Sequence, residues 1–134
     1  MEKQTLNKIF KLIHTNEGKA PLKWLIINNI PINDEYLRYN GSLDLSNTKI
    51  SFLPDDFEVL QDLDLRDCKD LIALPEGLKV GRDLNLRRCT NLKTLPKGLE
   101  VKGDLYISKS GVGNFTDSEI LKMIEPGFIK GDIF

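Results

Sequence analysis

Two consecutive stretches of the chain are close copies of each other. The first is LQDLDLRDCKDLIALPEGLKV, residues 60–80, and the second is GRDLNLRRCTNLKTLPKGLEV, residues 81–101. The positions that keep the same residue type at a spacing of 21 include nine apolar, cysteine, proline and glycine positions, namely Leu63/Leu84, Leu65/Leu86, Cys68/Cys89, Leu71/Leu92, Leu74/Leu95, Pro75/Pro96, Gly77/Gly98, Leu78/Leu99 and Val80/Val101. Such repetition at one fixed spacing is typical of a solenoid built from stacked repeats.

Shorter copies flank this pair on both sides. The same pattern continues, with a one-residue deletion in each case, over residues 41–59 (GSLDLSNTKISFLPDDFEV) and in shortened form over residues 102–115 (KGDLYISKSGVGNF). Leu43 and Leu45 occupy the first leucine positions upstream, and Leu105 and Ile107 occupy them downstream. The sequence therefore predicts about four repeats over residues 41–115.

Each repeat contains two patterns with different structural meanings. Leu-x-Leu is typical of a short strand whose alternate side chains face the core. The later Leu-x-x-Leu-Pro predicts an irregular, extended or 3₁₀ return path, because proline lacks an N–H for a central strand. A unit of this length cannot bury its own leucines. Stacking the units in parallel, about 4.8 Å apart, would build one continuous core.

The pattern L-x-L-x-x-C-x-x-L-x-x-L-P-x-G-L resembles the short bacterial class of leucine-rich repeat, which occurs in pathogen effectors and in small bacterial and phage proteins. The resemblance implies an α/β solenoid with a concave parallel β-sheet, which usually binds another protein. Asparagine is commoner in that class where this chain has Cys68 and Cys89. The catalytic domain of effector ubiquitin ligases with similar repeats does not follow these repeats, so their activity is not carried over.

Residues 1–40 are predicted to form a helical N-terminal cap. A second helix is expected to begin at Pro21, where proline suits the first helical turn, and a third at Asn33. A separate helical recognition module is the alternative, but the apolar face of the first helix favours a cap over the exposed end of the core. The residues of that face, at helical spacing, are Leu6, Ile9, Phe10 and Ile13.

Residues 116–134 are predicted to form the C-terminal cap. Thr116-Asp117-Ser118-Glu119 fits a capping box at the start of a short helix, which Pro126 and Gly127 would end. The following residues 129–134 (IKGDIF) echo residues 101–106 (VKGDLY). We therefore expect a degenerate fifth strand, with Ile133 facing inward beneath Leu105.

Composition narrows the class of protein further. The 134 residues suffice for one domain and carry 19 Lys and Arg against 20 Asp and Glu, a net charge of −1. This balance argues against binding to nucleic acid or a membrane surface through the whole molecule. The chain has no apolar stretch of membrane-spanning length and no signal-peptide pattern, so we expect a cytoplasmic protein.

Residues with catalytic or metal-binding chemistry are scarce. The chain has one histidine, His14, and two cysteines, Cys68 and Cys89, with no metal-ligand spacing and no phosphate-binding glycine loop. We expect no catalytic, metal or cofactor-binding residues and no enzymatic activity. A Cys–His nucleophile pair, a disulfide and a two-thiol metal site are alternatives for the cysteines. Buried free thiols on adjacent repeats are favoured, because no secretion signal is present.

The candidate binding surface is the outward face of the predicted sheet. Arg66, Arg87, Arg88 and Tyr106 are the expected anchors, because arginine and tyrosine are enriched at interface hot spots. The stacked aspartates on this face should repel one another at repeat spacing, and pairs of Lys or Arg with Asp in neighbouring columns are expected to relieve this repulsion. A solvated face whose charges pair with each other, or a binding surface on the flank around Phe52, are the alternatives. The full candidate set is Asp44, Asp62, Asp64, Arg66, Asp83, Asn85, Arg87, Arg88, Asp104 and Tyr106.

The sequence thus predicts a non-enzymatic, monomeric module that binds another protein. The resemblance suggests a small bacterial or phage inhibitor or effector that acts on a host protein. A second hypothesis is nucleic-acid binding through basic residues, against which the intervening aspartates argue. A third is an enzyme with a pocket beneath the caps. The basic residues of the second hypothesis are Arg66, Arg82, Arg87, Arg88 and Lys109.

Overall fold

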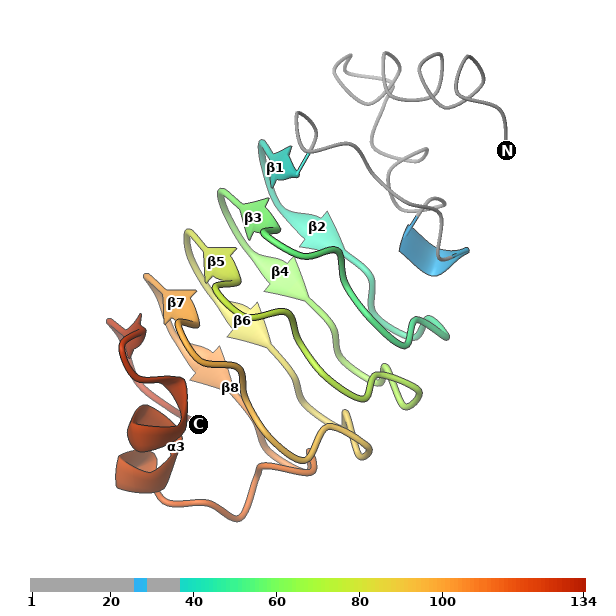
Figure 1. Cartoon of the computed structure of the whole chain (residues 1–134). Coiled ribbons are helices and arrows are strands. Elements are labelled where there is room, and N and C mark those ends of the chain that lie inside the picture. The colour runs from blue at the N-terminus through green and yellow to red at the C-terminus, as the bar shows by residue number, and fades with distance from the viewer. Residues whose placement is uncertain (1–25, 29–36) are drawn as a thin grey trace.

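A computed structural model describes residues 26–28 and 37–134 of the chain. The described chain winds into a parallel β-solenoid of about three turns, with repeats of about 21 residues (Figure 1). The expected first helix with its apolar face, the helix starts at Pro21 and Asn33, and His14 lie outside the described residues. Within the predicted cap, Ile26 and Ile27 are helical, and Ile26 is buried in the core.

The solenoid contains two parallel sheets of two-residue strands (Figure 1). The first sheet has the order β1 (Arg38–Tyr39), β3 (Glu58–Val59), β5 (Lys79–Val80), β7 (Glu100–Val101) and β9 (Phe128–Ile129). The second sheet has the order β2 (Leu43–Asp44), β4 (Leu63–Asp64), β6 (Leu84–Asn85) and β8 (Leu105–Tyr106).

The second sheet confirms the predicted Leu-x-Leu strands and their register. Leu43 pairs with Leu63, Leu63 with Leu84, and Leu84 with Leu105, all in parallel. The first sheet was not predicted. Its strands lie in the segments between the leucine-proline return and the next Leu-x-Leu, where no strand was expected. Its first strand, β1, also falls within residues 1–40, which were predicted to be a helical cap.

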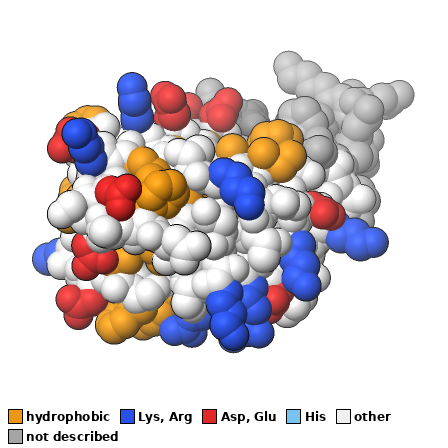
Figure 2. Space-filling model, turned by 90° about the horizontal axis from the view of Figure 1, so that it is seen from below, with side chains coloured by type: hydrophobic (Ala, Val, Ile, Leu, Met, Phe, Trp, Pro, Cys, Tyr) orange, Lys and Arg blue, Asp and Glu red, His pale blue; other side chains and the backbone are white. Residues whose placement is uncertain are grey.

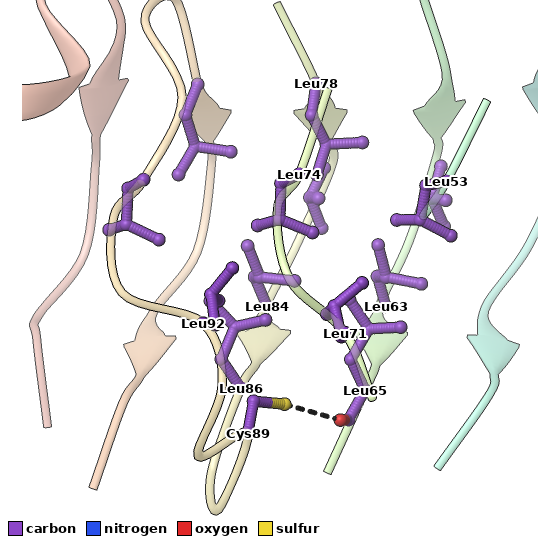
Figure 3. Close-up of a cluster of buried hydrophobic side chains, with 14 of the residues drawn as sticks. Leu53, Leu63, Leu65, Leu71, Leu74, Leu78, Leu84, Leu86, Cys89 and Leu92 are labelled. Carbon is purple, nitrogen blue, oxygen red and sulfur yellow. Dashed lines mark hydrogen bonds between the residues drawn. The ribbon is translucent and has the colours of Figure 1, made fainter. Parts of the chain in front are cut away.

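The core lies between the two sheets and the return segments. Leu63, Leu65, Leu84 and Leu86 are fully buried, as the alternation of the strands requires. Figure 3 shows these side chains with those of the return, among them Leu71 and Leu92, stacked from one turn to the next. Each fully buried leucine contributes roughly 1.5–3 kcal/mol, so the stack as a whole holds the turns together.

Left-handed backbone recurs at two corners of every turn. At the corner after the second sheet the φ angles are 57°, 58°, 60° and 60°, for Asn47, Asp67, Arg88 and Lys109 respectively. At the corner before the first sheet, Asp56, Gly77 and Gly98 have φ angles of 61°, 73° and 76°. The glycines of the Pro-x-Gly-Leu motif therefore occupy a conformation that Asp56 reaches at a cost.

The C-terminal end follows the prediction closely. Helix α3 (Asp117–Ile124) begins with a capping box, in which Thr116 Oγ1 accepts the Glu119 N–H (3.2 Å) and Glu119 Oε1 accepts the Thr116 N–H (3.1 Å). Beyond it, β9 pairs with β7, and Ile133 forms a parallel bridge with Leu105. The fifth strand is thus present, with its residues divided between the two sheets.

Candidate functional site

The outer face of the second sheet carries every candidate binding residue. Its side chains form four columns that run along the solenoid axis, one residue per turn. The first column precedes the buried leucine of each strand and consists of Ser42, Asp62, Asp83, Asp104 and Asp132. The second lies between the leucines and consists of Asp44, Asp64, Asn85 and Tyr106. The third consists of Ser46, Arg66, Arg87 and Ser108, and the fourth of Asn47, Asp67, Arg88 and Lys109.

The first column is an aspartate ladder, a name used below for Asp62, Asp83, Asp104 and Asp132. Oδ1 of Asp62 accepts the N–H of Asp83 (3.0 Å), and Oδ1 of Asp83 accepts the N–H of Asp104 (2.8 Å). Oδ1 of Asp104 in turn accepts the N–H of Asp132 (2.8 Å), while Ser42 Oγ starts the ladder by accepting the Asp62 N–H (3.2 Å). The carboxylates of Asp62, Asp83 and Asp104 therefore each accept a main-chain donor of the next turn.

The ladder explains how stacked carboxylates coexist at repeat spacing. The sequence suggested that cations of neighbouring columns relieve their repulsion. In the structure, the N–H dipole of the following turn lies against each carboxylate of Asp62, Asp83 and Asp104 instead. These three candidates are thus positioned by the fold itself and contribute to joining the turns.

Asp44, Asp64 and Asn85 of the second column each form a turn at the end of their strand. Oδ1 of Asp44 accepts the N–H of Ser46 (2.9 Å), and Oδ1 of Asn85 accepts the N–H of Arg87 (3.1 Å). Oδ1 of Asp64 accepts the N–H of Arg66 in the same way, at 3.1 Å. Asp and Asn side chains favour this bond to the main chain two residues onward, which introduces a turn.

Two of the expected arginine anchors are engaged with acidic neighbours. Arg66 Nη2 lies 3.0 Å from Asp64 Oδ2, and its Nε also donates to the same carboxylate. This hydrogen bond with Asp64 raises the pKa of Arg66 above its ordinary value. Arg88 Nε lies 3.4 Å from Asp67 Oδ1. Both pairs are partly exposed to solvent, so they orient the guanidinium groups more than they stabilise the fold.

The third arginine anchor belongs to an aromatic stack. The guanidinium carbon of Arg87 lies 4.4 Å from the ring centroid of Tyr106. The Tyr106 ring stacks in turn on Phe134, with centroids 5.2 Å apart and planes 17° from parallel. The three side chains come from successive turns and form a continuous platform. Phe134 was placed on the terminal strand by the sequence but was not predicted as a site residue, although its alignment with Tyr106 could have revealed it.

The rival surface around Phe52 is also exposed. Phe52 is 51% exposed and Ile72, on the next turn, is 55% exposed. The N–H of Ile72 donates to the carbonyl of Ser51 (3.2 Å), so the two segments are directly adjacent. Both lie on the return segments rather than on a sheet. No polar platform comparable with that of Arg87 and Tyr106 accompanies them in the described part of the chain.

The cysteines are free, buried thiols, as the sequence predicted. Cys68 Sγ donates to the carbonyl of Leu45 on the preceding turn (3.1 Å). Cys89 Sγ donates in the same way to the carbonyl of Leu65 (2.9 Å), as Figure 3 shows. Burial raises the pKa of Cys68, and it raises that of Cys89 to about 12. A thiolate, the reactive form of cysteine, is therefore disfavoured at both positions.

The charge distribution and the metal-ligand inventory complete the description. Figure 2 shows acidic, basic and apolar side chains interspersed on one face of the molecule. Residues 26–28 and 37–134 include no group of three or more histidine, cysteine or acidic side chains suited to a metal ion. No helix among these residues is long and apolar enough to cross a membrane. No known protein family, curated protein or solved structure matches the chain.

Proposed function

We propose that the chain is a non-enzymatic, protein-binding module that recognises another protein through the outer face of the second sheet. The platform formed by Arg87, Tyr106 and Phe134 is the observation that carries this proposal. Arginine and aromatic side chains are the residue types most enriched at interface hot spots. A stacked platform also loses less side-chain entropy on binding than three independent side chains do.

The surroundings of the platform favour recognition of a mixed, partly acidic protein surface. Arg66 and Arg88 are held by Asp64 and Asp67 with much of each guanidinium exposed, at 43% and 53% of the side chain. An acidic group on a partner could share these oriented donors. The neighbouring carboxylates would repel a polyanion, which weakens the alternative of a nucleic-acid binder that uses Arg66, Arg82, Arg87 and Arg88.

The family assignment is part of the same proposal. Parallel Leu-x-Leu strands at a 21-residue period, a proline-containing return and a short terminal helix support a leucine-rich repeat of the short bacterial class. A small bacterial or phage inhibitor or effector that acts on a host protein is the biological form that this class suggests. Its expected location is the cytoplasm.

The chemistry of the described residues supports a binding role over catalysis. The two thiols are buried, with the pKa of Cys89 raised to about 12, so neither is suited to nucleophilic attack at neutral pH. Within the ladder, the carboxylates of Asp62, Asp83 and Asp104 are engaged with main-chain N–H groups of the next turn. General acid–base catalysis needs a titratable group directed at a substrate, and these carboxylates are committed to the fold.

The experiment starts from the identity of the partner. The tagged chain is used to capture proteins from a lysate of its native cell, and the candidate identified by mass spectrometry is purified for calorimetric titration. Arg87→Ala and Tyr106→Ala are each expected to weaken binding by about tenfold or more. Arg82→Ala is the matched control, because Arg82 is an exposed arginine outside the four columns, and it should change the affinity by less than about threefold.

The same variants distinguish the alternatives. Equal losses for all three substitutions, together with tight and steeply salt-dependent binding to DNA or RNA, would favour the nucleic-acid hypothesis. Undiminished binding by both Arg87→Ala and Tyr106→Ala would exclude the outer face of the second sheet. The Phe52 and Ile72 surface would then be the next to test, with Phe52→Ala.

A further inference from the structure

The terminal segment reads almost the same in both directions. Residues 128–134 are Phe-Ile-Lys-Gly-Asp-Ile-Phe, with Gly131 at the centre. Ile129 and Ile133 lie two residues from Gly131 on either side, and Phe128 and Phe134 lie three residues from it. The remaining pair consists of Lys130 and Asp132, which are opposite in charge. Such a segment is complementary to itself when a second copy of it runs in the opposite direction.

This segment is also the open edge of both sheets. The N–H groups of Phe128 and Lys130 donate inward to Leu99 and Val101 (2.9 and 2.8 Å), which turns the main-chain groups of Ile129 away from β7. Ile133 is likewise the outer member of its bridge with Leu105. In the part of the chain that the structure describes, no strand lies beyond β9 or Ile133. Unpaired edge groups of this kind are a template for pairing with another strand.

The side chains at this end are apolar and incompletely covered. Phe128 is 41% exposed and Phe134 is 55% exposed, and Ile129 and Ile133 pack against the core while remaining partly exposed. A depression between α3 and the terminal segment is lined by the apolar side chains of Leu121, Ile129, Ile133 and Phe134 together with Asp117, Gly131 and Asp132. A terminal repeat that leaves apolar side chains exposed is an incomplete cap.

We propose that two copies of the chain associate end to end about a two-fold axis through Gly131. Each terminal segment pairs antiparallel with that of the second copy, so Ile129 lies opposite Ile133 of the second copy and the two exchange main-chain hydrogen bonds. Lys130 then lies opposite Asp132 of the second copy, at the closely spaced positions of an antiparallel ladder. This dimer differs from the monomer expected from the sequence, and it does not rest on the proposed partner-binding function.

The bend of the segment is compatible with this symmetry. β9 belongs to the first sheet and Ile133 bridges to the second, so the chain turns a corner at Gly131. Rotation by 180° about an axis that bisects this corner places the residues before Gly131 of one copy alongside the residues after Gly131 of the other copy, running in the opposite direction. Both copies then use the same surface, as an isologous interface requires. Phe128 of the second copy would then extend the stack of Tyr106 and Phe134 across the interface.

Sedimentation equilibrium of the full chain tests the proposal over a range from about 1 µM to about 1 mM, where small interfaces dissociate. The mean mass is expected to rise with concentration from 15.2 kDa to twice that value and no further. Lys130→Asp and Asp132→Lys each place two pairs of like charges in the interface, and each should weaken association by about tenfold or more. The double variant K130D/D132K restores both ion pairs and should recover affinity to within about threefold.

The control for charge alone is Lys102→Asp, because Lys102 occupies the position equivalent to Lys130 one turn earlier and is exposed. It should leave the association constant unchanged. Circular dichroism melting of every variant verifies that the solenoid stays folded. A chain that remains monomeric over the whole range, a dimer insensitive to the charge reversals, or assembly beyond the dimer would each overturn the proposal.

Discussion

Removing one carboxylate from the aspartate ladder tests whether the ladder joins the turns. Asp83 is the best position, because its Oδ1 accepts the Asp104 N–H at 2.8 Å while its own N–H donates to Asp62 at 3.0 Å. Asp83→Ala removes the acceptor, whereas Asp83→Asn keeps an oxygen at the same place and removes only the charge. The two variants therefore separate hydrogen bonding from charge repulsion.

The expected magnitudes follow from two opposing contributions. A hydrogen bond to a charged group contributes about 1.5–3 kcal/mol to stability. Repulsion between carboxylates about 5 Å apart costs about 0.8 kcal/mol per neighbour at the dielectric of water, since the column is partly exposed. With two carboxylate neighbours the repulsion offsets about 1.6 kcal/mol, so Asp83→Ala should lower the free energy of unfolding by at most about 1.4 kcal/mol. Asp83→Asn keeps a neutral hydrogen bond of about 0.5–1.5 kcal/mol, so it should be more stable than Asp83→Ala by about that amount.

Urea unfolding followed by far-ultraviolet circular dichroism measures both values by linear extrapolation. Glu76→Gln, which removes one charge from an exposed side chain of the preceding repeat, is the control and should be neutral within about 0.5 kcal/mol. Equal stability of the alanine and asparagine variants would refute the role of the hydrogen bond. An Asp83→Ala variant more stable than the parent would show that repulsion dominates the column.

Three further predictions concern the core, a strained corner and the terminal strand. Because burial raises the pKa of Cys89 to about 12, the thiol ionises at a lower pH in the unfolded chain than in the folded protein. The free energy of unfolding, measured by urea titrations at several pH values, should therefore fall as the pH rises from about 9 towards 12, more steeply than in Cys89→Ala. Arg88→Asn should raise the free energy of unfolding by about 0.5–1 kcal/mol, measured by the same method, because asparagine tolerates the left-handed φ of 60° better than arginine. Deleting residues 127–134 should lower the free energy of unfolding by several kcal/mol and promote aggregation visible by light scattering, because the deletion exposes the edges of β7 and β8. A soluble, equally stable product would show that the terminal strand is not a cap.

The repeated leucines made the second sheet predictable, whereas the first sheet was not. Leu63 and Leu65 alternate around a polar residue, and their recurrence at Leu84 and Leu86 gives both the strand and its register. The strands of the first sheet carry a similar signal, because Leu78 and Val80 are buried on either side of Lys79 and recur as Leu99 and Val101. That signal was not interpreted as a strand, because the preceding proline and glycine indicate an irregular return.

The candidate site was predictable as a surface but not as a set of contacts. The repeat alignment placed Asp62, Asp83 and Asp104 in one column, which is correct. It treated them as three stacked charges, because a sequence pattern registers side chains and not the main-chain donors beside them. The missing element was the N–H group of each following turn, which lies within 3.0 Å of a carboxylate oxygen in both of the bonds that join these three residues.

The proposed binding face and the proposed dimer edge meet at one side chain. Phe134 forms the exposed end of the platform with Arg87 and Tyr106, and it also lies in the self-complementary terminal segment. If a partner protein covers the outer ring face of Phe134, dimerisation and partner binding compete, and by linkage each weakens the other by the same factor. If the partner contacts Arg87 and Tyr106 alone, the two equilibria are independent. Measuring the affinity for the partner in Lys130→Asp, which disfavours the dimer without altering the platform, decides between these cases: tighter binding indicates competition, and unchanged binding indicates independence.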